Sequence, residues 1–110
     1  MFHHVAHSVE PTVLFYTWSE GLRLWKRILV EVPEVFAFVI MPNHLHLLHV
    51  VDVRLQLAHA IGSYVHERNA RRGWNTAGVK PLPPADPVAS FEKQRRDERY
   101  VYLNPREQGW

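Results

Sequence analysis

Two apolar segments separated by a Pro-Asn turn lie in the middle of the chain and predict a β-hairpin. Residues 35–41 are rich in β-branched and aromatic side chains, which is typical of a buried strand. Pro42 and Asn43 form a turn signal, and residues 44–51 are the second strand candidate. The chain is therefore expected to build its sheet around this antiparallel pair.

The segment before the hairpin predicts a strand and a helix. Residues 2–7 indicate a short first strand, and residues 12–16 are a candidate extension of the sheet. Residues 19–31 predict a helix, which Pro33 stops. The apolar face expected for this helix consists of residues that recur at helical spacing: Leu22, Trp25, Ile28 and Leu29.

A second helix is expected after the hairpin, with Asp52 as its N-cap and Gly73 as its end. It runs to about Arg71. Its apolar stripe is formed by Leu57, Ala58, Ile61, Tyr64 and Val65.

The character of the chain changes in residues 74–89, where prolines exclude a helix and indicate an ordered loop or linker: Pro81, Pro83, Pro84 and Pro87. Ser90 is the expected N-cap of a last helix that reaches about Leu103, because Pro105 disfavours helical geometry at Asn104.

The order of elements is strand, helix, strand, strand, helix. This β-α-β-β-α order predicts an α+β fold of the ferredoxin-like split type, with an antiparallel sheet, helices on one of its faces and an additional C-terminal helix. With 110 residues the chain is long enough for one domain, expected to cover residues 1–110.

Composition excludes several classes of protein. The chain has no Cys, which excludes disulfides and thiolate metal sites. It has no apolar run of the roughly 20 residues that a membrane helix needs, and its start lacks the pattern of a signal peptide. We therefore expect a cytoplasmic protein with no membrane partner.

The formal net charge of +2 is uninformative, but basic residues gather late in the chain. Such clusters can hold a phosphate backbone, and a solvated helix face is the alternative interpretation. The first cluster is Arg68, Arg71 and Arg72, and the second is Lys93, Arg95, Arg96 and Arg99.

His44 and His46 at the start of the second hairpin strand are candidate metal ligands. Side chains alternate along a strand, so both imidazoles point to one face, about 6.5–7 Å apart along the strand, and can converge on one divalent cation. His49 has the opposite parity. A structural role for the pair is the alternative. A metallo-hydrolase of the H-x-H-x-D-H type would need Asp where Leu48 stands, and a closed zinc site lacks Cys or nearby carboxylate ligands.

The run Met-Pro-Asn-His-Leu-His-Leu-Leu at residues 41–48 resembles the HUH motif of the REP-associated tyrosine transposases and their insertion-sequence (IS200-like) relatives. Residues 36–40, Phe-Ala-Phe-Val-Ile, are similar to the strand that leads into that motif. His4-Val5-Ala6 is similar to the family's first strand. The chain is therefore expected to be a single HUH transposase-like catalytic domain.

A second motif near the C-terminus is similar to the Tyr-Ile/Val-x-x-Asn-Pro helix of the same family. Residues 100–105 read Tyr-Val-Tyr-Leu-Asn-Pro. The resemblance implies that Tyr100 is the nucleophile and that Asn104 joins His44 and His46 as the third metal ligand. Residues four apart on a helix share one face, which agrees with that pairing of roles. Tyr102 is the alternative nucleophile.

The family resemblance implies an endonuclease and strand transferase that cleaves and rejoins single-stranded DNA beside hairpins through a 5′-phosphotyrosine intermediate, with Mg²⁺ or Mn²⁺ as cofactor. Arg96 or Arg99 is a candidate for favouring the phenolate of Tyr100. Backbone contacts are expected from Arg68, Arg71, Arg72, Lys80, Arg95, Arg96 and Arg99, and base stacking from Trp74 or Trp110.

Two alternatives to an active nuclease stay open. Between the second helix and the tyrosine, only residues 71–74 loosely match the family pattern. The chain stops five residues after the Asn-Pro pair, so a truncated domain, or a hairpin-binding relative without catalysis, is one alternative. A metal-binding structural protein without a DNA role is another. The oligomeric state is also open: the proline-rich stretch would permit a homodimer that exchanges the tyrosine helix.

Overall fold

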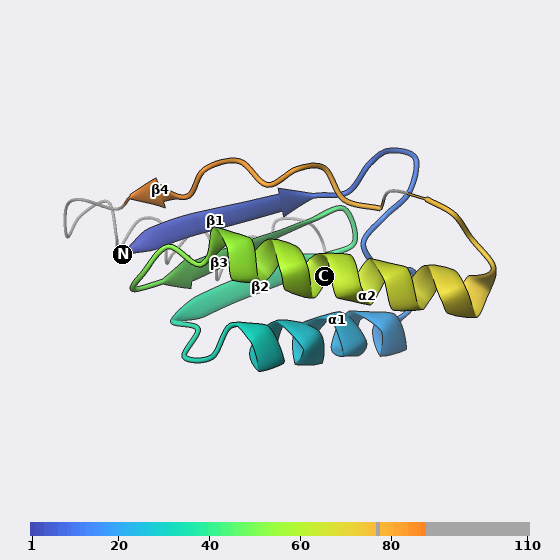
Figure 1. Ribbon diagram of the computed structural model, residues 1–110, viewed down its shortest axis with the longest axis horizontal. Coiled ribbons are helices and arrows are strands. Elements are labelled where there is room, and N and C mark those ends of the chain that lie inside the picture. Colours follow the sequence, from blue (N-terminus) through green and yellow to red (C-terminus); the bar gives the residue numbers. More distant parts are fainter. Residues whose placement is uncertain (77, 88–110) are drawn as a thin grey trace.

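A computed structural model of the protein describes residues 1–76 and 78–87. The expected last helix over residues 90–103 lies outside these residues. In chain order the elements are β1 (Phe2–His7), α1 (Trp18–Glu31), β2 (Ala37–Met41), β3 (His44–His49), α2 (Arg54–Arg72) and β4 (Asp86–Pro87) (Figure 1).

The four strands form one antiparallel sheet in the order β2-β3-β1-β4. Both helices lie side by side on one face of this sheet (Figure 1). In the centre, β1 pairs with β3 along its whole length, from Phe2 opposite His49 to His7 opposite His44. The hairpin of β2 and β3 is present, with Met41 opposite His44. The predicted α+β fold with a ferredoxin-like sheet is confirmed.

The proline-rich segment, expected to be a loop or linker, runs along the free edge of β1 and ends in β4. Lys80 N–H donates to the His7 carbonyl at 2.8 Å, and Asp86 pairs with His3. A proline is tolerated in such a strand because only one side of an edge strand needs N–H donors. The periodicity of the sequence could not reveal a strand of two residues.

Helix α1 begins at Trp18, one residue before the predicted start, because Thr17 caps it: the Thr17 hydroxyl accepts a hydrogen bond from Glu20 N–H at 3.2 Å. The predicted apolar face is partly wrong. Leu22 and Leu29 are exposed, whereas Leu24 and Ile28 are buried. The helix presents the Leu24 side to the core because α2 packs beside it.

The start of α2 also differs from the prediction by a small shift. The capping position is Val53, without a side-chain cap, and Asp52 accepts a hydrogen bond from Arg54 N–H at 2.9 Å just before the helix. Gly73 ends the helix in the left-handed conformation with φ 67°, as predicted. The buried side of α2 is formed by Leu57, Ala60, Ile61, Tyr64, Val65 and Arg68.

The expectation that residues 12–16 extend the sheet is wrong. These residues have no regular secondary structure, yet Leu14 and Phe15 are buried in the core. The Leu14 N–H donates to the Pro42 carbonyl, and side chains of α2 donate to the Val13 and Leu14 carbonyls. Tyr64 donates its hydroxyl hydrogen to the Leu14 carbonyl at 2.7 Å.

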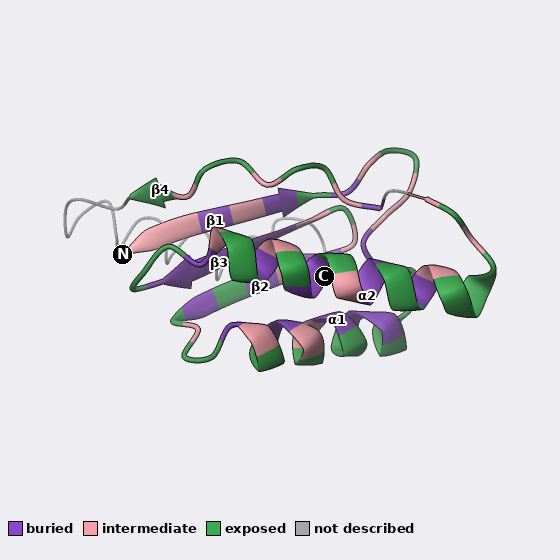
Figure 2. Cartoon of the chain, in the orientation of Figure 1, coloured by how far each residue is buried: buried purple, intermediate pink, exposed green. Residues whose placement is uncertain are grey.

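Apolar side chains are buried on both faces of the sheet. The larger cluster lies between the sheet and the two helices, whose outer surfaces are exposed (Figure 2). The opposite face carries a smaller buried cluster from β2 and β3, composed of Ala37, Val39, Met41 and Leu48. Within residues 1–76 and 78–87, no helix is long and apolar enough to cross a membrane.

Candidate metal centre

The two histidines of the predicted pair lie together on β3, on the face of the sheet opposite the helices. The ring centroids of His44 and His46 are 5.1 Å apart, and the ring planes are nearly perpendicular at 89°. A metal bound at about 2.1 Å by an imidazole nitrogen lies about 3 Å from the ring centre, so two rings on one ion are separated by about 4.5–5.5 Å. The separation of the pair fits one shared ion.

Two further histidines from β1 join this pair and were missed by the sequence reasoning. His7 pairs with His44 across the strands, and His3 lies diagonal to His46. The rings of His3 and His46 stack at 5.1 Å, and those of His7 and His44 stack at 5.7 Å. The parity of residues 2–7 places His3 and His7 on one face. Only the pairing of β1 with β3 brings that face to the candidate site.

These four histidines, His3, His7, His44 and His46, are called the imidazole cluster below. Within it, hydrogen bonds engage the Nδ1 atom of each residue of the predicted pair. The amide oxygen of Asn43 lies 2.7 Å from Nδ1 of His44, and Nε2 of His3 lies 2.9 Å from Nδ1 of His46. A ligating histidine commonly donates one ring N–H to such a partner and binds metal with the other nitrogen. The arrangement therefore favours Nε2 as the metal-binding atom of both residues.

Burial keeps both candidate ligands neutral. The pKa of His46 is lowered to about 3, mainly because the ring is removed from water and further because the other imidazoles of the cluster repel a positive charge. Burial also lowers the pKa of His44, with a smaller contribution from His7. Neutral imidazole is the form that binds metal ions, so the pair is ready to coordinate at neutral pH.

The described part of the chain supplies two nitrogen ligands and no more. In residues 1–76 and 78–87 there is no group of three or more His, Cys, Asp or Glu side chains that could hold a metal ion. Asn104, implied as the third ligand, and Tyr100, implied as the nucleophile, lie outside the described residues. Two imidazoles with a neutral oxygen ligand suit Mn²⁺ or Mg²⁺ and leave positions for substrate oxygens.

Two other histidines lie on the helix side of the sheet, away from the imidazole cluster. His49 is buried with Nε2 3.0 Å from the Pro33 carbonyl, in agreement with its predicted parity. His4 is also buried. Its Nε2 accepts a hydrogen bond from Val53 N–H at 3.0 Å, and its Nδ1 lies 3.3 Å from the Leu47 carbonyl. Burial lowers the pKa of His4, which connects β1 to the start of α2 as a neutral residue.

A solved REP-associated tyrosine transposase has the same fold. The two structures superpose with a TM-score of 0.68 at 18% sequence identity, over 99% of this chain and 68% of the other. That transposase was solved bound to a REP hairpin. The likeness at this identity is one of fold. No protein-family model matches the sequence, and no curated protein matches it.

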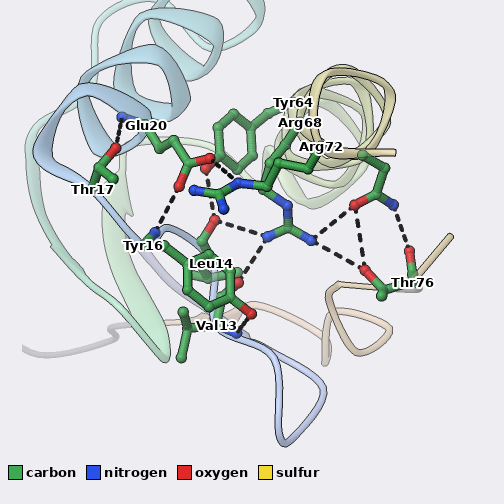
Figure 3. Close-up of polar contacts among 10 residues, drawn as sticks. Val13, Leu14, Tyr16, Thr17, Glu20, Tyr64, Arg68, Arg72 and Thr76 are labelled. Carbon is green, nitrogen blue, oxygen red and sulfur yellow. Dashed lines mark hydrogen bonds and ion pairs between the residues drawn. The ribbon is translucent and has the colours of Figure 1, made fainter. Parts of the chain in front are cut away.

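Arg68, predicted to contact DNA, is fully buried. Its guanidinium donates to the carbonyls of Val13 at 2.8 Å and Leu14 at 3.1 Å (Figure 3). It therefore holds the irregular segment before α1 against α2. A phosphate contact would require an exposed guanidinium, whereas that of Arg68 is turned inward to the half-buried Val13 and the buried Leu14.

Arg72 and Trp74 lie in a mixed aromatic and charged contact at the end of α2. Nε of Arg72 is 2.7 Å from Oε2 of Glu20, and its guanidinium lies 4.7 Å from the Trp74 ring centre and 5.1 Å from that of Tyr16. Trp74 is half-buried and meets Tyr16 edge to face at 5.2 Å. Both predicted DNA contacts therefore also stabilise the fold.

Arg71 is the remaining predicted DNA contact on α2. It is exposed, and no ion pair involves it among the described residues. Lys80 is exposed as well. The other predicted basic contacts, Arg95, Arg96 and Arg99, lie outside the described residues, as does Trp110.

Proposed function

We propose that this protein is a metal-dependent endonuclease and transposase that cleaves and rejoins single-stranded DNA beside a hairpin. The observation that carries the proposal is the geometry of His44 and His46: the rings are 5.1 Å apart, and the Nδ1 atom of each is engaged in a hydrogen bond. The likeness in fold to a tyrosine transposase that was solved with a DNA hairpin supports the same function.

The residues of this chain have separate roles in the proposed reaction. His44, His46 and Asn104 would hold Mg²⁺ or Mn²⁺, which supplies Lewis-acid polarisation of the scissile phosphate when bound. The phenolic oxygen of Tyr100 attacks phosphorus, and the bond from phosphorus to the 3′ oxygen breaks. The tyrosine proton ends on the departing 3′-hydroxyl, and a 5′-phosphotyrosine link forms. Attack of a 3′-hydroxyl on that link reverses the step and rejoins the strand.

The neutral state of the imidazole pair favours this chemistry. Because the pKa of His46 is about 3, a proton does not compete with the ion for this ligand near neutral pH. Burial of the ring also excludes water from one side of the site, which strengthens electrostatic interactions with a phosphate. A charged imidazolium pair would bind a phosphate directly and would repel a cation.

The proposed DNA contacts come from exposed basic residues. Arg71 and Lys80 are exposed in the structure, and Arg95, Arg96 and Arg99 join them in the proposal. Arg68 is left out because it is buried. Unpaired bases would stack on aromatic side chains such as Trp110, or on Trp74 at its exposed edge.

A covalent-adduct experiment tests the proposal. The full chain is incubated with labelled single-stranded hairpin oligonucleotides and Mn²⁺, and the mixture is separated on a denaturing protein gel. We expect a labelled protein–DNA adduct that disappears without metal, in Tyr100→Phe and in His44→Ala. The matched controls are Tyr102→Phe, and His66→Ala on the exposed surface of α2, and both should retain the adduct.

The outcomes separate three functions. An adduct that survives Tyr100→Phe but disappears in Tyr102→Phe would move the nucleophile by two residues. Tight, salt-sensitive binding of hairpin DNA with no adduct for the wild type would contradict catalysis and indicate a hairpin-binding protein. Metal binding without any affinity for DNA would indicate a structural metal protein.

A further inference from the structure

We propose that His3 and Asn43 are positioning residues that hold the imidazoles of His46 and His44 with the proton on Nδ1, so that each presents Nε2 to the metal. The effect of these two residues on metal binding rests on the proposed metal-dependent function. The hydrogen bonds from which their roles are inferred join protein atoms only. Asn43 lies in the hairpin turn and His3 lies in β1.

The direction of the hydrogen bond between Asn43 and His44 follows from its atoms. Oδ1 of Asn43 lies 2.7 Å from Nδ1 of His44, and an amide oxygen can only accept. Nδ1 of His44 therefore carries the proton and donates it. A neutral imidazole has one N–H, so Nε2 of His44 is then the nitrogen with a lone pair, which is the atom that a metal needs.

The contact between His3 and His46 has two possible directions, and metal binding selects one of them. Nε2 of His3 lies 2.9 Å from Nδ1 of His46. When Nε2 of His46 binds a metal, the remaining proton must be on Nδ1, and Nε2 of His3 must accept it. His3 then carries its own proton on Nδ1. The ligand and its partner thus adopt matched tautomers.

Packing restricts the rotation of both rings in this contact. His3 comes from β1 and His46 from β3, and the stacked rings are inclined by only 29°. His46 is 6% exposed, so its ring cannot turn away into solvent. A partner that is fixed on a neighbouring strand orients the ligand more strongly than a residue on a flexible loop would.

His7 provides a matched control within the same cluster. It lies on the same strand and the same face as His3 and stacks on His44 with a centroid distance of 5.7 Å. The contact between His7 and the pair is a ring contact, without a hydrogen bond among the described residues. Replacing His7 by Phe preserves that stacking, whereas His3→Phe preserves stacking and removes the acceptor for His46.

The test measures Mn²⁺ affinity by titration calorimetry at a fixed pH of about 7.5, where unperturbed imidazole is mostly neutral. We expect His3→Phe and Asn43→Ala each to weaken binding by about 10–100-fold, the effect found for lost partners of metal ligands. His7→Phe should change the affinity by less than about threefold. His3→Gln and Asn43→Asp should retain most of the wild-type Mn²⁺ affinity, because both keep an oxygen that accepts from Nδ1–H. If the two residues had a purely structural role, these variants would bind Mn²⁺ as weakly as His3→Phe and Asn43→Ala.

Imidazole tautomers give a second measurement that does not depend on activity. In two-bond ¹H–¹⁵N NMR spectra of the metal-free protein, His44 should carry its proton on Nδ1, and Asn43→Ala should shift it towards Nε2. With diamagnetic Zn²⁺ as the probe, Nδ1 of His46 should be protonated. The inference would be overturned if His44 of the wild type carried its proton on Nε2. It would also be overturned if His3→Phe lost no more Mn²⁺ affinity than His7→Phe.

The two proposals fail in different ways. If the tautomers are as expected but neither Mn²⁺ nor Zn²⁺ binds, the metal-dependent function is contradicted and the assignment of Asn43 as the partner of His44 stands. If the metals bind and His44→Ala abolishes binding, while His3→Phe and Asn43→Ala bind as tightly as the wild type, the metal site stands and the positioning roles are wrong.

Discussion

Arg72 at the end of α2 and Glu20 in the first turn of α1 form an ion pair, with Nε of Arg72 2.7 Å from Oε2 of Glu20. The other carboxylate oxygen of Glu20 accepts from Tyr16 N–H at 2.8 Å (Figure 3). Only 7% of the Glu20 side chain is exposed. This contact joins the two helices at the end of the molecule where the chain enters α1, and it gives a basic residue of α2 a structural role.

The first prediction concerns the pH dependence of this pair. Burial alone would raise the pKa of Glu20, but the hydrogen bonds from Arg72 and Tyr16 and the charge of Arg68 outweigh it, and the pKa is lowered. A carboxyl whose pKa is lower in the folded state contributes stability above its ordinary pKa of about 4.3, and that contribution is lost as the pH falls through the folded-state value.

We therefore expect Glu20→Gln to lower the free energy of unfolding by about 1–2 kcal/mol at pH 7. The difference between wild type and variant should shrink as the pH falls below about 4. Urea denaturation of both proteins at several pH values measures it. A difference that stayed constant from pH 7 to pH 3 would show that the charge of Glu20 does not carry the effect.

The second prediction concerns Arg68, whose burial makes it a structural residue. Arg68→Met should reduce the free energy of unfolding by about 3 kcal/mol, because the Val13 and Leu14 carbonyls lose the hydrogen bonds from Arg68 and Leu14 keeps only the one from Tyr64. Arg68→Lys should lower the free energy of unfolding by less than Arg68→Met but should not match the wild type, since one ammonium group cannot reproduce the planar fork of a guanidinium. Denaturant unfolding measures the change. Arg71→Met, one turn away and exposed, is the control and should stay within about 0.5 kcal/mol of wild type.

The third prediction concerns Gly78, where both the backbone and the space require glycine. Its φ is +77°, and an added Cβ would lie 2.6 Å from Cγ1 of the buried Val65. Gly78→Ala should lower the free energy of unfolding by about 2–4 kcal/mol. Gly62 in α2 has open space at the Cβ position, so Gly62→Ala should stabilise by about 0.5–1 kcal/mol. Equal effects of the two substitutions on the thermal midpoint would contradict this assignment.

The fourth prediction distinguishes Arg71 from its neighbours as a DNA contact. Arg71→Ala should weaken binding of single-stranded hairpin DNA and reduce the slope of log affinity against log salt concentration by about 0.7, the value for one phosphate contact on a single strand. Arg23→Ala is the control, because Arg23 is exposed but lies 3.8 Å from Glu67 on the helix surface. Fluorescence titrations across a salt series measure both. Identical slopes for Arg71→Ala and wild type would show that Arg71 does not contact a phosphate of the DNA.

The fifth prediction follows from the proposed metal centre. Mn²⁺ at 100 times its Kd should stabilise the wild type by about 2.7 kcal/mol, because the ion binds the folded state. His46→Ala should lose this stabilisation, and His66→Ala should retain it. Thermal unfolding with and without Mn²⁺ gives the comparison. An equal shift of the midpoint in His46→Ala and wild type would place the ion elsewhere.

Local patterns in the sequence were sufficient to predict β1, β2, β3 and both helices, and part of the candidate site. Alternation along residues 44–49 put His44 and His46 on one face and His49 on the other, as the structure has them. The helical pattern and Gly73 predicted α2 and its end. These features depend on residues that are close in the chain, and the geometry of a single strand or helix determines them.

Contacts between distant elements were decided by the tertiary structure. His3 reaches His46 only because β1 pairs with β3 in one register, and a slip by one residue would turn His3 to the other face. Arg68 has the sequence context of a surface residue, yet the irregular segment before α1 brings the carbonyls of Val13 and Leu14 within hydrogen-bonding distance of its guanidinium. The sequence by itself determined which side chains share a face of each element. The packing of those elements decided which faces meet, because burial and hydrogen-bond satisfaction depend on neighbours far apart in the chain.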